Sequence, residues 1–352
     1  MDNHPVKIPS SPLVSVVVAS FNQKDILCRC LESVFQQEYR PIEVIVVDNG
    51  SSEVILDTVA AGFPDCRVLR NEVNLGFAGG YNRGIQDAAG DYVAILNNDA
   101  IASPQWLSSL VAAAERDDSI GSVGSIILDG NRPGFLDSCG VGISFDGMSR
   151  QAKKGRVPPV LSGPKEVLLV SGCACLFRMQ ALRVIGLFDE DFFAYCEDTD
   201  LGLRLRWAGW RAVVVPGCEV IHYYSMTTGK FSLDKLFWVE RNHVWVAVKN
   251  FPLVVLFLFP LVTILRYFVQ LYAGMHGSEE LREFRKKKGL SAIIATVVRA
   301  YIAAFEGIPR MMSKRRSFTA KRRISSNKMM KLLMTFRLPL LEIVKEGEHA
   351  GN

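Results

Sequence analysis

Short apolar runs that end in polar residues alternate with helical patterns over the first 115 residues of this 352-residue chain. Residues 14–19, 42–47, 66–69 and 92–96 have the length and composition of buried strands. Apolar residues recur at helical spacing over 25–37, and shorter helices are expected near 58, before 89 and over 104–115. Strands that alternate with helices predict right-handed crossovers and a mostly parallel sheet, which is an α/β fold.

Polar residues follow two of these predicted strands. Asn97, Asn98 and Asp99 come directly after 92–96, and Asp48 comes directly after 42–47. In open α/β sheets, ligands bind outside the carboxyl ends of the strands. A carboxylate there is suited to hold a divalent cation and, through it, a diphosphate. Asn and Asp also begin turns, so this segment alone leaves a turn and a ligand site open.

Residues 74–84, where a helix is expected to begin, contain four glycines. Their positions are Gly76, Gly79, Gly80 and Gly84. This spacing differs from the G-x-G-x-x-G pattern of dinucleotide-binding proteins, which disfavours a dehydrogenase.

Four acidic residues gather around the start of a helix that we expect to end near residue 209. They are Asp191, Glu197, Asp198 and Asp200. Carboxylates stabilise a helix N-terminus by about 0.3–1 kcal/mol each, which accounts for one or two of them. A carboxylate cluster also raises some of its own pKa values, which suits a general base.

His222 ends a run at 220–222 that we expect to be a strand, separate from another at 211–215. Together with Asp99, its imidazole makes a candidate site for Mg²⁺ or Mn²⁺. A core or surface histidine is the alternative at this point. Residues 120–170 are rich in Gly, Ser and Pro and are expected to form irregular loops and edge strands.

Several ordered motifs within residues 12–250 carry a family resemblance. The chain resembles family 2 glycosyltransferases with the GT-A fold, and more narrowly their bacterial rhamnosyltransferase-like branch. The motifs are VVVASFN (16–22), VVDNGSS (46–52), NLGFAGGYNRG (74–84), LNND (96–99), GLFDEDFF (186–193), EDTDL (197–201), RLRWAG (204–209) and His222.

The resemblance implies roles for individual residues. Asp198 matches the catalytic base, whereas Asp99 and His222 match the ligands of a Mg²⁺ or Mn²⁺ ion. The residues expected to bind the donor are Ala19, Phe21, Asp48, Gly76, Asn82 and Asn98, with Lys230 and Arg241 expected to neutralise its diphosphate. Two positions depart from the pattern, since Tyr81 stands where many relatives have Arg and Glu53 where Asp is usual.

The implied activity is the inverting, metal-dependent transfer of a sugar, with rhamnose as one candidate, from a dTDP- or UDP-sugar. The acceptor is expected to be lipid-linked or a cell-surface polysaccharide. A direct displacement needs one base, unlike the paired carboxylates of glycoside hydrolases. A nucleotidyltransferase and a non-catalytic nucleotide-sugar scaffold remain as alternatives.

The charge of the chain changes sharply after residue 250. Residues 1–250 carry 23 Lys/Arg against 29 Asp/Glu, a net of −6, whereas residues 251–352 carry 18 against 7, a net of +11. Residues 251–273 are apolar apart from Arg266, long enough to span a bilayer as a helix. The chain is therefore divided into a tail (1–11), a GT-A domain (12–250), membrane-associated helices (251–310) and a basic tail (311–352).

Basic runs after the apolar helix conflict with a single span, because the nucleotide-sugar site also needs the cytoplasm. A hairpin of 251–273 with 290–308, or helices lying in the membrane interface, resolves the conflict, and the interface is favoured. We therefore expect the cytoplasmic face of the cell membrane, with a peripheral or embedded C-terminus. A buried helix of a soluble homo-oligomer stays open, and nucleic acid is not expected as a partner.

Overall fold

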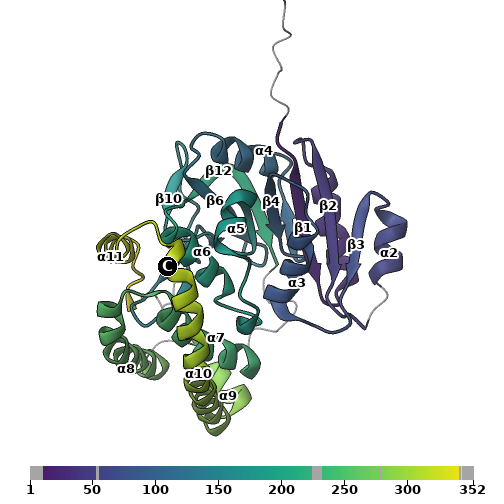
Figure 1. Cartoon of the computed structure of the whole chain (residues 1–352). Coiled ribbons are helices and arrows are strands. Elements are labelled where there is room, and N and C mark those ends of the chain that lie inside the picture. The colour runs from purple at the N-terminus through teal and green to yellow at the C-terminus, as the bar shows by residue number, and fades with distance from the viewer. Residues whose placement is uncertain (1–10, 53–54, 224–231, 277–278, 341, 343–352) are drawn as a thin grey trace, which may run out of the picture.

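The computed structural model describes residues 11–52, 55–223, 232–276, 279–340 and 342. Parallel strands form one half of a ten-stranded sheet (Figure 1). In spatial order they are β4 (Tyr92–Leu96), β1 (Val14–Ser20), β2 (Ile42–Asp48) and β3 (Cys66–Arg70). Helices α1 (Lys24–Phe35), α2 (Ile55–Gly62) and α3 (Gly76–Gln86) connect them. The predicted α/β fold with a mostly parallel sheet is confirmed.

The other half of the sheet comes from residues 100–222. Next to β4 lies β11 (Ala174–Arg178), which is antiparallel to both of its neighbours. The remaining strands in order are β6 (Ile120–Asp129), β12 (Arg211–His222) and β10 (Lys165–Val167), with β5 (Ala100–Ala102) on β12 and β7 (Leu136–Ser138) on β6. A separate hairpin pairs β8 (Val141–Ile143) with β9 (Ser149–Gln151).

Two expectations about this half are wrong. Residues 120–129 form a long central strand and not a loop, because Gly121 and Gly124 leave room for large neighbours. A Cβ at Gly121 would lie 2.7 Å from Trp210. Residues 211–222 form one strand and not two, since a register shift between Val214 and Glu219 absorbs the intervening turn residues.

Successive side chains of the strands point to opposite faces of the sheet. Val17 and Ile95 face the layer that contains α3, α5 (Met179–Ile185) and α6 (Glu197–Trp207). Val16 and Ala94 face α1, α2 and α4 (Trp106–Ala114). The sheet therefore lies between two helical layers, and its strand ends are left free to carry polar residues.

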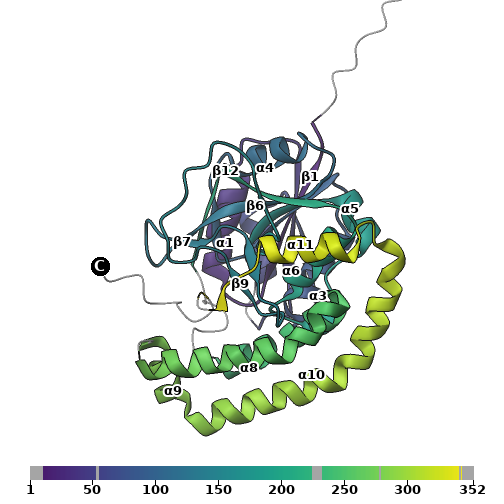
Figure 2. The same cartoon turned by 90° about the vertical axis from the view of Figure 1, so that its left-hand side faces the viewer.

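Five helices follow the last strand. They are α7 (Leu233–Asn250), α8 (Leu253–His276), α9 (Glu279–Lys288), α10 (Leu290–Phe318) and α11 (Ser326–Thr335). Figure 2 shows α8 and α10 running along the lower side of the body, joined at one end by α9. The indole of Trp245 on α7 packs on Gly307 of α10 and donates a 3.0 Å hydrogen bond to the carbonyl of Ala304.

Helices were expected at 251–273 and 290–308, and α8 and α10 cover both ranges. By length and hydropathy alone, segments 253–272 and 290–321 are each able to cross a membrane. The sequence analysis did not predict α7 or α11. In α7, polar and aromatic residues are mixed, so its helical stripe is weak.

Candidate active site

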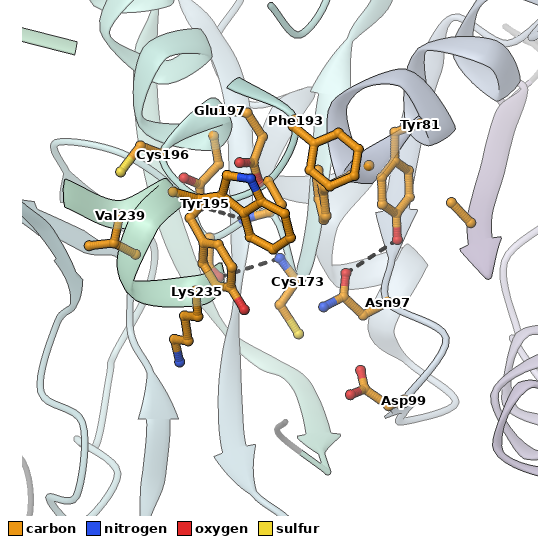
Figure 3. A pocket seen from close by; sticks show the side chains of 18 of the residues that line it. Tyr81, Asn97, Asp99, Cys173, Phe193, Tyr195, Cys196, Glu197, Lys235 and Val239 are labelled. Carbon is orange, nitrogen blue, oxygen red and sulfur yellow. Dashed lines mark hydrogen bonds between the residues drawn. The ribbon is translucent and has the colours of Figure 1, made fainter. Parts of the chain in front are cut away.

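The carboxyl ends of β1, β2 and β4 meet at one edge of the sheet, because β1 pairs in register with both neighbours. Residues that follow these strands line a cavity of about 560 Å³. The region from β7 to just after β9, the residues before β11, the end of β12 and the first turns of α6 and α7 form much of the remaining wall. In Figure 3, Tyr81, Asn97 and Asp99 lie on one side of Cys173, and Tyr195, Lys235 and Val239 lie on the other.

The imidazole of His222 lies between two carboxylates. Its Nε2 is 3.1 Å from Asp99 Oδ1, and its Nδ1 is 2.8 Å from Asp137 Oδ2. The pairing of β5 with β12 sets Ala100 opposite His222, which brings Asp99 to the histidine. All three side chains are buried and line the cavity.

Charges around this imidazole shift the pKa values of the group. Burial alone lowers the pKa of His222, but Cys173, Asp137 and Asp99 beside it raise that pKa well above its usual value. Burial raises the pKa of Asp137, but His222 and Lys154 outweigh it and hold that pKa below its usual value. Lys154 Nζ donates to Asp137 Oδ1 at 2.8 Å, so Asp137 is fixed from both sides.

The pair Asp99 and His222 fits the dimensions of a divalent-cation site. Two ligands at right angles, each about 2.1 Å from the same ion, lie about 3 Å apart. The observed separation of 3.1 Å matches this distance. Within the described ranges, no group of three or more His, Cys, Asp or Glu side chains is placed to bind a metal. An ion held here would take its remaining ligands from water or from a phosphate.

Asp198 begins α6 and faces the same cavity. Its Oδ1 accepts a 2.6 Å hydrogen bond from the Thr199 amide, and its Oδ2 accepts a 3.2 Å bond from the Gly172 amide. Burial raises the pKa of Asp198 despite these bonds. A carboxylate with a raised pKa that still points into a cavity is suited to accept a proton.

The other acidic residues around this helix have different roles. Asp200 is fully buried and binds Arg204 at 2.8 Å and Lys249 at 2.9 Å, which ties α6 to α7. Asp191 binds Arg310 of α10 at 2.8 Å. Glu197 lines the cavity beside Asp198. The acidic cluster thus divides into a structural half and a half that faces the cavity.

The predicted donor-binding residues are only partly brought together. Ala19, Phe21, Gly76 and Asn98 line the cavity with Asp99, Asp198 and His222. Asp48, Asn82 and Arg241 are not among the lining residues. Lys230 lies outside the described residues.

The three residues away from the cavity have local partners. Asp48 accepts a 2.9 Å hydrogen bond from the amide of Ser51. Asn82 donates to the carbonyl of Phe188 and accepts from its amide, joining α3 to the segment before α6. Arg241 donates to the carbonyls of Asp191 and Phe192 at 3.1 Å and 3.0 Å. Its guanidinium therefore supports a loop, and the structure gives it no contact with the cavity.

Asp137, Tyr195 and Trp238 are among the cavity-lining residues that sequence reasoning missed. Asp137 lies in the Gly- and Ser-rich region that gave no regular pattern. Trp238 lies on α7, which was not predicted. The side chain of Tyr81 lies at the end of β4, since its hydroxyl is 2.9 Å from Leu96 O and 3.2 Å from Asn97 Oδ1, and its single hydrogen is shared between these two acceptors.

Comparison with known proteins agrees with this fold. Residues 15–186 match the model of glycosyl transferase family 2. A relative from Mycobacterium tuberculosis, N-acetylglucosaminyl-diphospho-decaprenol L-rhamnosyltransferase, is 30% identical over 243 residues, which cover 62% of this chain and 78% of the relative.

Two solved structures share the fold at low sequence identity. GalNAc-T7 with UDP, GalNAc and Mn²⁺ gives a TM-score of 0.60 at 17% identity, covering 78% of this chain and 55% of that one. The mannosyltransferase PcManGT from Pyrobaculum calidifontis, with GDP-Man and Mn²⁺, gives 0.51 at 16% identity, covering 89% and 86%.

The fold and the family match define a glycosyltransferase with the GT-A fold. The chain belongs to glycosyl transferase family 2, and within it the chain is rhamnosyltransferase-like. The resemblance seen in the sequence is confirmed. Membership of a glycosyltransferase family argues against the two alternatives, a nucleotidyltransferase and a non-catalytic scaffold.

Proposed function

We propose that this enzyme transfers a sugar from a nucleotide-diphosphate donor to a hydroxyl of a lipid-linked acceptor, with inversion at the anomeric carbon. The observation that carries the proposal is one cavity lined by Asp198 and by the pair Asp99 and His222, whose facing atoms are 3.1 Å apart. A base and a site for the leaving diphosphate are the two things that a direct displacement needs.

Asp198 is proposed to act as the base. Its carboxylate takes the proton of the acceptor hydroxyl while the hydroxyl oxygen attacks the anomeric carbon and the bond to the diphosphate breaks. Amide hydrogen bonds from Gly172 and Thr199 keep the carboxylate in one orientation. The raised pKa makes Asp198 a stronger proton acceptor than an exposed aspartate.

Asp99 and His222 are proposed to hold Mn²⁺ or Mg²⁺. The bound ion supplies charge that stabilises the departing nucleoside diphosphate. Asp137 holds the imidazole so that its Nε2 faces Asp99. Ala19, near the end of β1, and Phe21, directly after it, remain the proposed contacts of the nucleoside.

The proposed donor and acceptor are taken from the rhamnosyltransferase relative, whose name gives a rhamnosyl group and N-acetylglucosaminyl-diphospho-decaprenol. We take dTDP-rhamnose as the first donor to test, with UDP-sugars next. An N-acetylglucosaminyl-diphospho-polyprenol is the first acceptor to test.

The C-terminal helices support a membrane-bound acceptor. Large apolar side chains are exposed along α8 and α10, namely Phe257, Leu261, Ile264, Phe268, Leu271, Leu290, Ile294, Val298, Ile302 and Phe305. We call α8, α9 and α10 with these side chains the apolar arm. Arg285 and Lys286–Lys288, at the end of α9, add an exposed basic run that suits anionic lipid headgroups.

We propose that the arm lies in the interface of the cytoplasmic leaflet and does not cross it. The face of α10 opposite its exposed side chains is buried on the body, at Thr296, Ala300, Ala304 and Gly307. On α8, Arg266 is fully buried in ion pairs with the body. A spanning helix would have to leave these contacts, whereas a helix lying in the interface keeps them.

The proposal is tested by separating donor binding from transfer. Asp198→Asn is expected to abolish release of nucleoside diphosphate in the presence of acceptor but to leave Mn²⁺-dependent donor binding intact in calorimetry. Asp99→Ala is expected to weaken that binding. Normal turnover by Asp198→Asn would exclude this residue as the base.

A further inference from the structure

Three aromatic side chains that pack on one another line the same cavity as Asp198, namely Phe193, Tyr195 and Trp238. Figure 3 shows Phe193 and Tyr195 apart from Asp99. The ring centroids of Phe193 and Trp238 are 5.0 Å apart, and those of Tyr195 and Trp238 are 6.3 Å apart with the planes nearly parallel. All three rings are half-buried. Aromatic rings kept half-exposed in a polar cavity present flat apolar faces to whatever enters it.

The loop that carries two of these rings has an unfavourable backbone conformation. Phe193, Tyr195 and Cys196 have φ values of 63°, 68° and 68°, in a region that residues other than glycine rarely adopt. Each such residue costs about 1–3 kcal/mol and persists only when its surroundings enforce it. A loop that served only as a connection could use glycine there, so the side chains themselves are needed.

Asn242 of α7 enforces this conformation. Its side-chain amide is fully buried and donates to the carbonyls of Phe192, Ala194 and Tyr195 at 2.9, 3.0 and 2.7 Å. Arg241 adds bonds to the carbonyl of Phe192 and to the preceding one. The helix that supplies Trp238 therefore also fixes the loop that supplies the other two rings, so the aromatic group is rigid before any ligand binds.

A polar group without a partner lies beside these rings. Glu197 lines the cavity, is 5% exposed, and its Oε2 has no hydrogen-bond partner. Burial and the neighbouring Asp198 raise its pKa well above the usual value, so the carboxyl can both donate and accept. An unpaired buried polar atom costs free energy that a ligand hydroxyl would recover.

We propose that Phe193, Tyr195, Trp238 and Glu197 form the subsite for the terminal pyranose ring of the acceptor. The apolar face of the sugar ring lies on the aromatic rings, a sugar hydroxyl bonds to Glu197, and the reacting hydroxyl reaches Asp198. This subsite rests on the proposed function for its occupant, because it assumes that the acceptor ends in a sugar. Ala19 and Phe21, the proposed nucleoside contacts, lie beside the Asn98–Asp99 segment, since Asn98 Nδ2 donates to Ser20 Oγ at 3.1 Å. Phe193 packs against Gly76 and so borders both parts of the cavity.

The test uses full-length enzyme and one defined probe, N-acetylglucosaminyl-diphospho-farnesol, at saturating dTDP-rhamnose and Mn²⁺. Trp238→Ala is expected to raise the acceptor KM about tenfold or more and to leave the donor KM unchanged. Trp238→Phe is expected to restore most of the acceptor affinity. Trp210→Ala is the matched control, because that half-buried indole precedes β12 at the end opposite His222 and is not among the cavity-lining residues.

Equilibrium binding of the probe, followed by tryptophan fluorescence, separates the subsite from the reaction. A saturable change in fluorescence that disappears in Trp238→Phe supports the subsite, even if no nucleoside diphosphate is released. Absence of nucleoside diphosphate release would count against the proposed function alone. An acceptor KM that Trp238→Ala leaves unchanged, a rise in the donor KM instead, or no binding of the probe by the wild-type enzyme would each overturn the subsite. Melting temperatures of the variants exclude unfolding as the cause.

Discussion

Asp137 Oδ2 lies 2.8 Å from His222 Nδ1, so the histidine that faces Asp99 is held from behind by a second carboxylate. With an ion bound between His222 and Asp99, the Asp137 carboxylate would hold the ring proton on Nδ1 and leave Nε2 to bind the ion. Metal-binding histidines are commonly oriented in this way, and the orienting carboxylate affects affinity although it never touches the ion.

Asp137→Ala is therefore expected to weaken Mn²⁺ binding about 10- to 100-fold, measured by calorimetry in the presence of UDP. Asp117→Ala is the control, because Asp117 also pairs with a cation, Arg211 at 2.7 Å, but next to the opposite end of β12. Equal Mn²⁺ affinity in wild type and Asp137→Ala would mean that His222 does not bind the ion.

The pH dependence of transfer should report Asp198. A base acts in its deprotonated form, so kcat/KM for the acceptor should fall as the pH drops through the pKa of Asp198. Burial raises that pKa, so the fall should begin at a higher pH than the 3.8 of an exposed aspartate predicts. Circular dichroism over the same range separates this loss from unfolding. A rate that stays constant down to about pH 4, while the protein remains folded, would contradict the assignment.

Arg266 should matter for stability more than any exposed arginine. Its guanidinium is fully buried between Asp146, at 2.7 Å, and Glu240, at 2.9 Å. Arg266→Met leaves two buried carboxylates without their cation, which should lower the free energy of unfolding by about 3–5 kcal/mol in urea titrations. Arg299→Met on the exposed side of α10 should change it by no more than about 0.5 kcal/mol. Similar values for the two variants would contradict a structural role for the buried pairs.

The same ion pairs should contribute a pH-dependent part of the stability. Burial raises the pKa of Glu240, but Arg266 outweighs it and lowers that pKa to about 2. A lowered pKa means that the stabilisation is complete above the unfolded-state value near 4.5 and is lost as the pH falls toward 2. Unfolding free energies of wild type and Glu240→Gln should therefore converge at low pH, and a constant difference would contradict the pKa shift.

Membrane binding should depend on the exposed side chains of α8. Phe257 and Leu261 are 85% and 66% exposed. Replacing both by Glu should lower binding to vesicles containing anionic lipid at least tenfold in flotation assays, since each buried side chain contributes about 1.5–3 kcal/mol. Val160→Glu, at a fully exposed apolar residue of the body, should leave binding unchanged. Equal loss in both variants, or none in either, would contradict a specific role of the apolar arm.

The parallel half of the sheet could be predicted because its signals are local. Each strand is a β-branched run, each ends in turn residues, and parallel pairing brings Asp48 and Asp99 to one edge. β6 could not be predicted in the same way, because its glycines are required by the close packing of Trp210 and Val170 against the strand. Those neighbours are distant in sequence, so the local sequence pattern of the strand does not show the contacts.

Site residues were predicted where a family motif coincides with the end of a strand, as at Asp99 and His222, or with the start of a helix, as at Asp198. These three residues met that condition and line one cavity. Arg241 did not, since its charge suggested a diphosphate contact whereas its bonds go to backbone carbonyls of a loop about 50 residues earlier. Asp137 and Trp238 were missed because a single Asp or Trp carries no pattern until the fold sets it beside a partner.

Helix α7 contributes both to the cavity and to the contact with the apolar arm. α7 lines the cavity with Trp238 and, less than one turn later, presents Glu240 to Arg266 of the apolar arm. In the membrane orientation proposed above, this connection would fix the height of the reacting hydroxyl above the lipid surface. An acceptor with one sugar on a diphosphate would then reach Asp198, whereas a longer glycan would carry its terminal hydroxyl past it. We expect a single addition per acceptor, after which the product no longer fits.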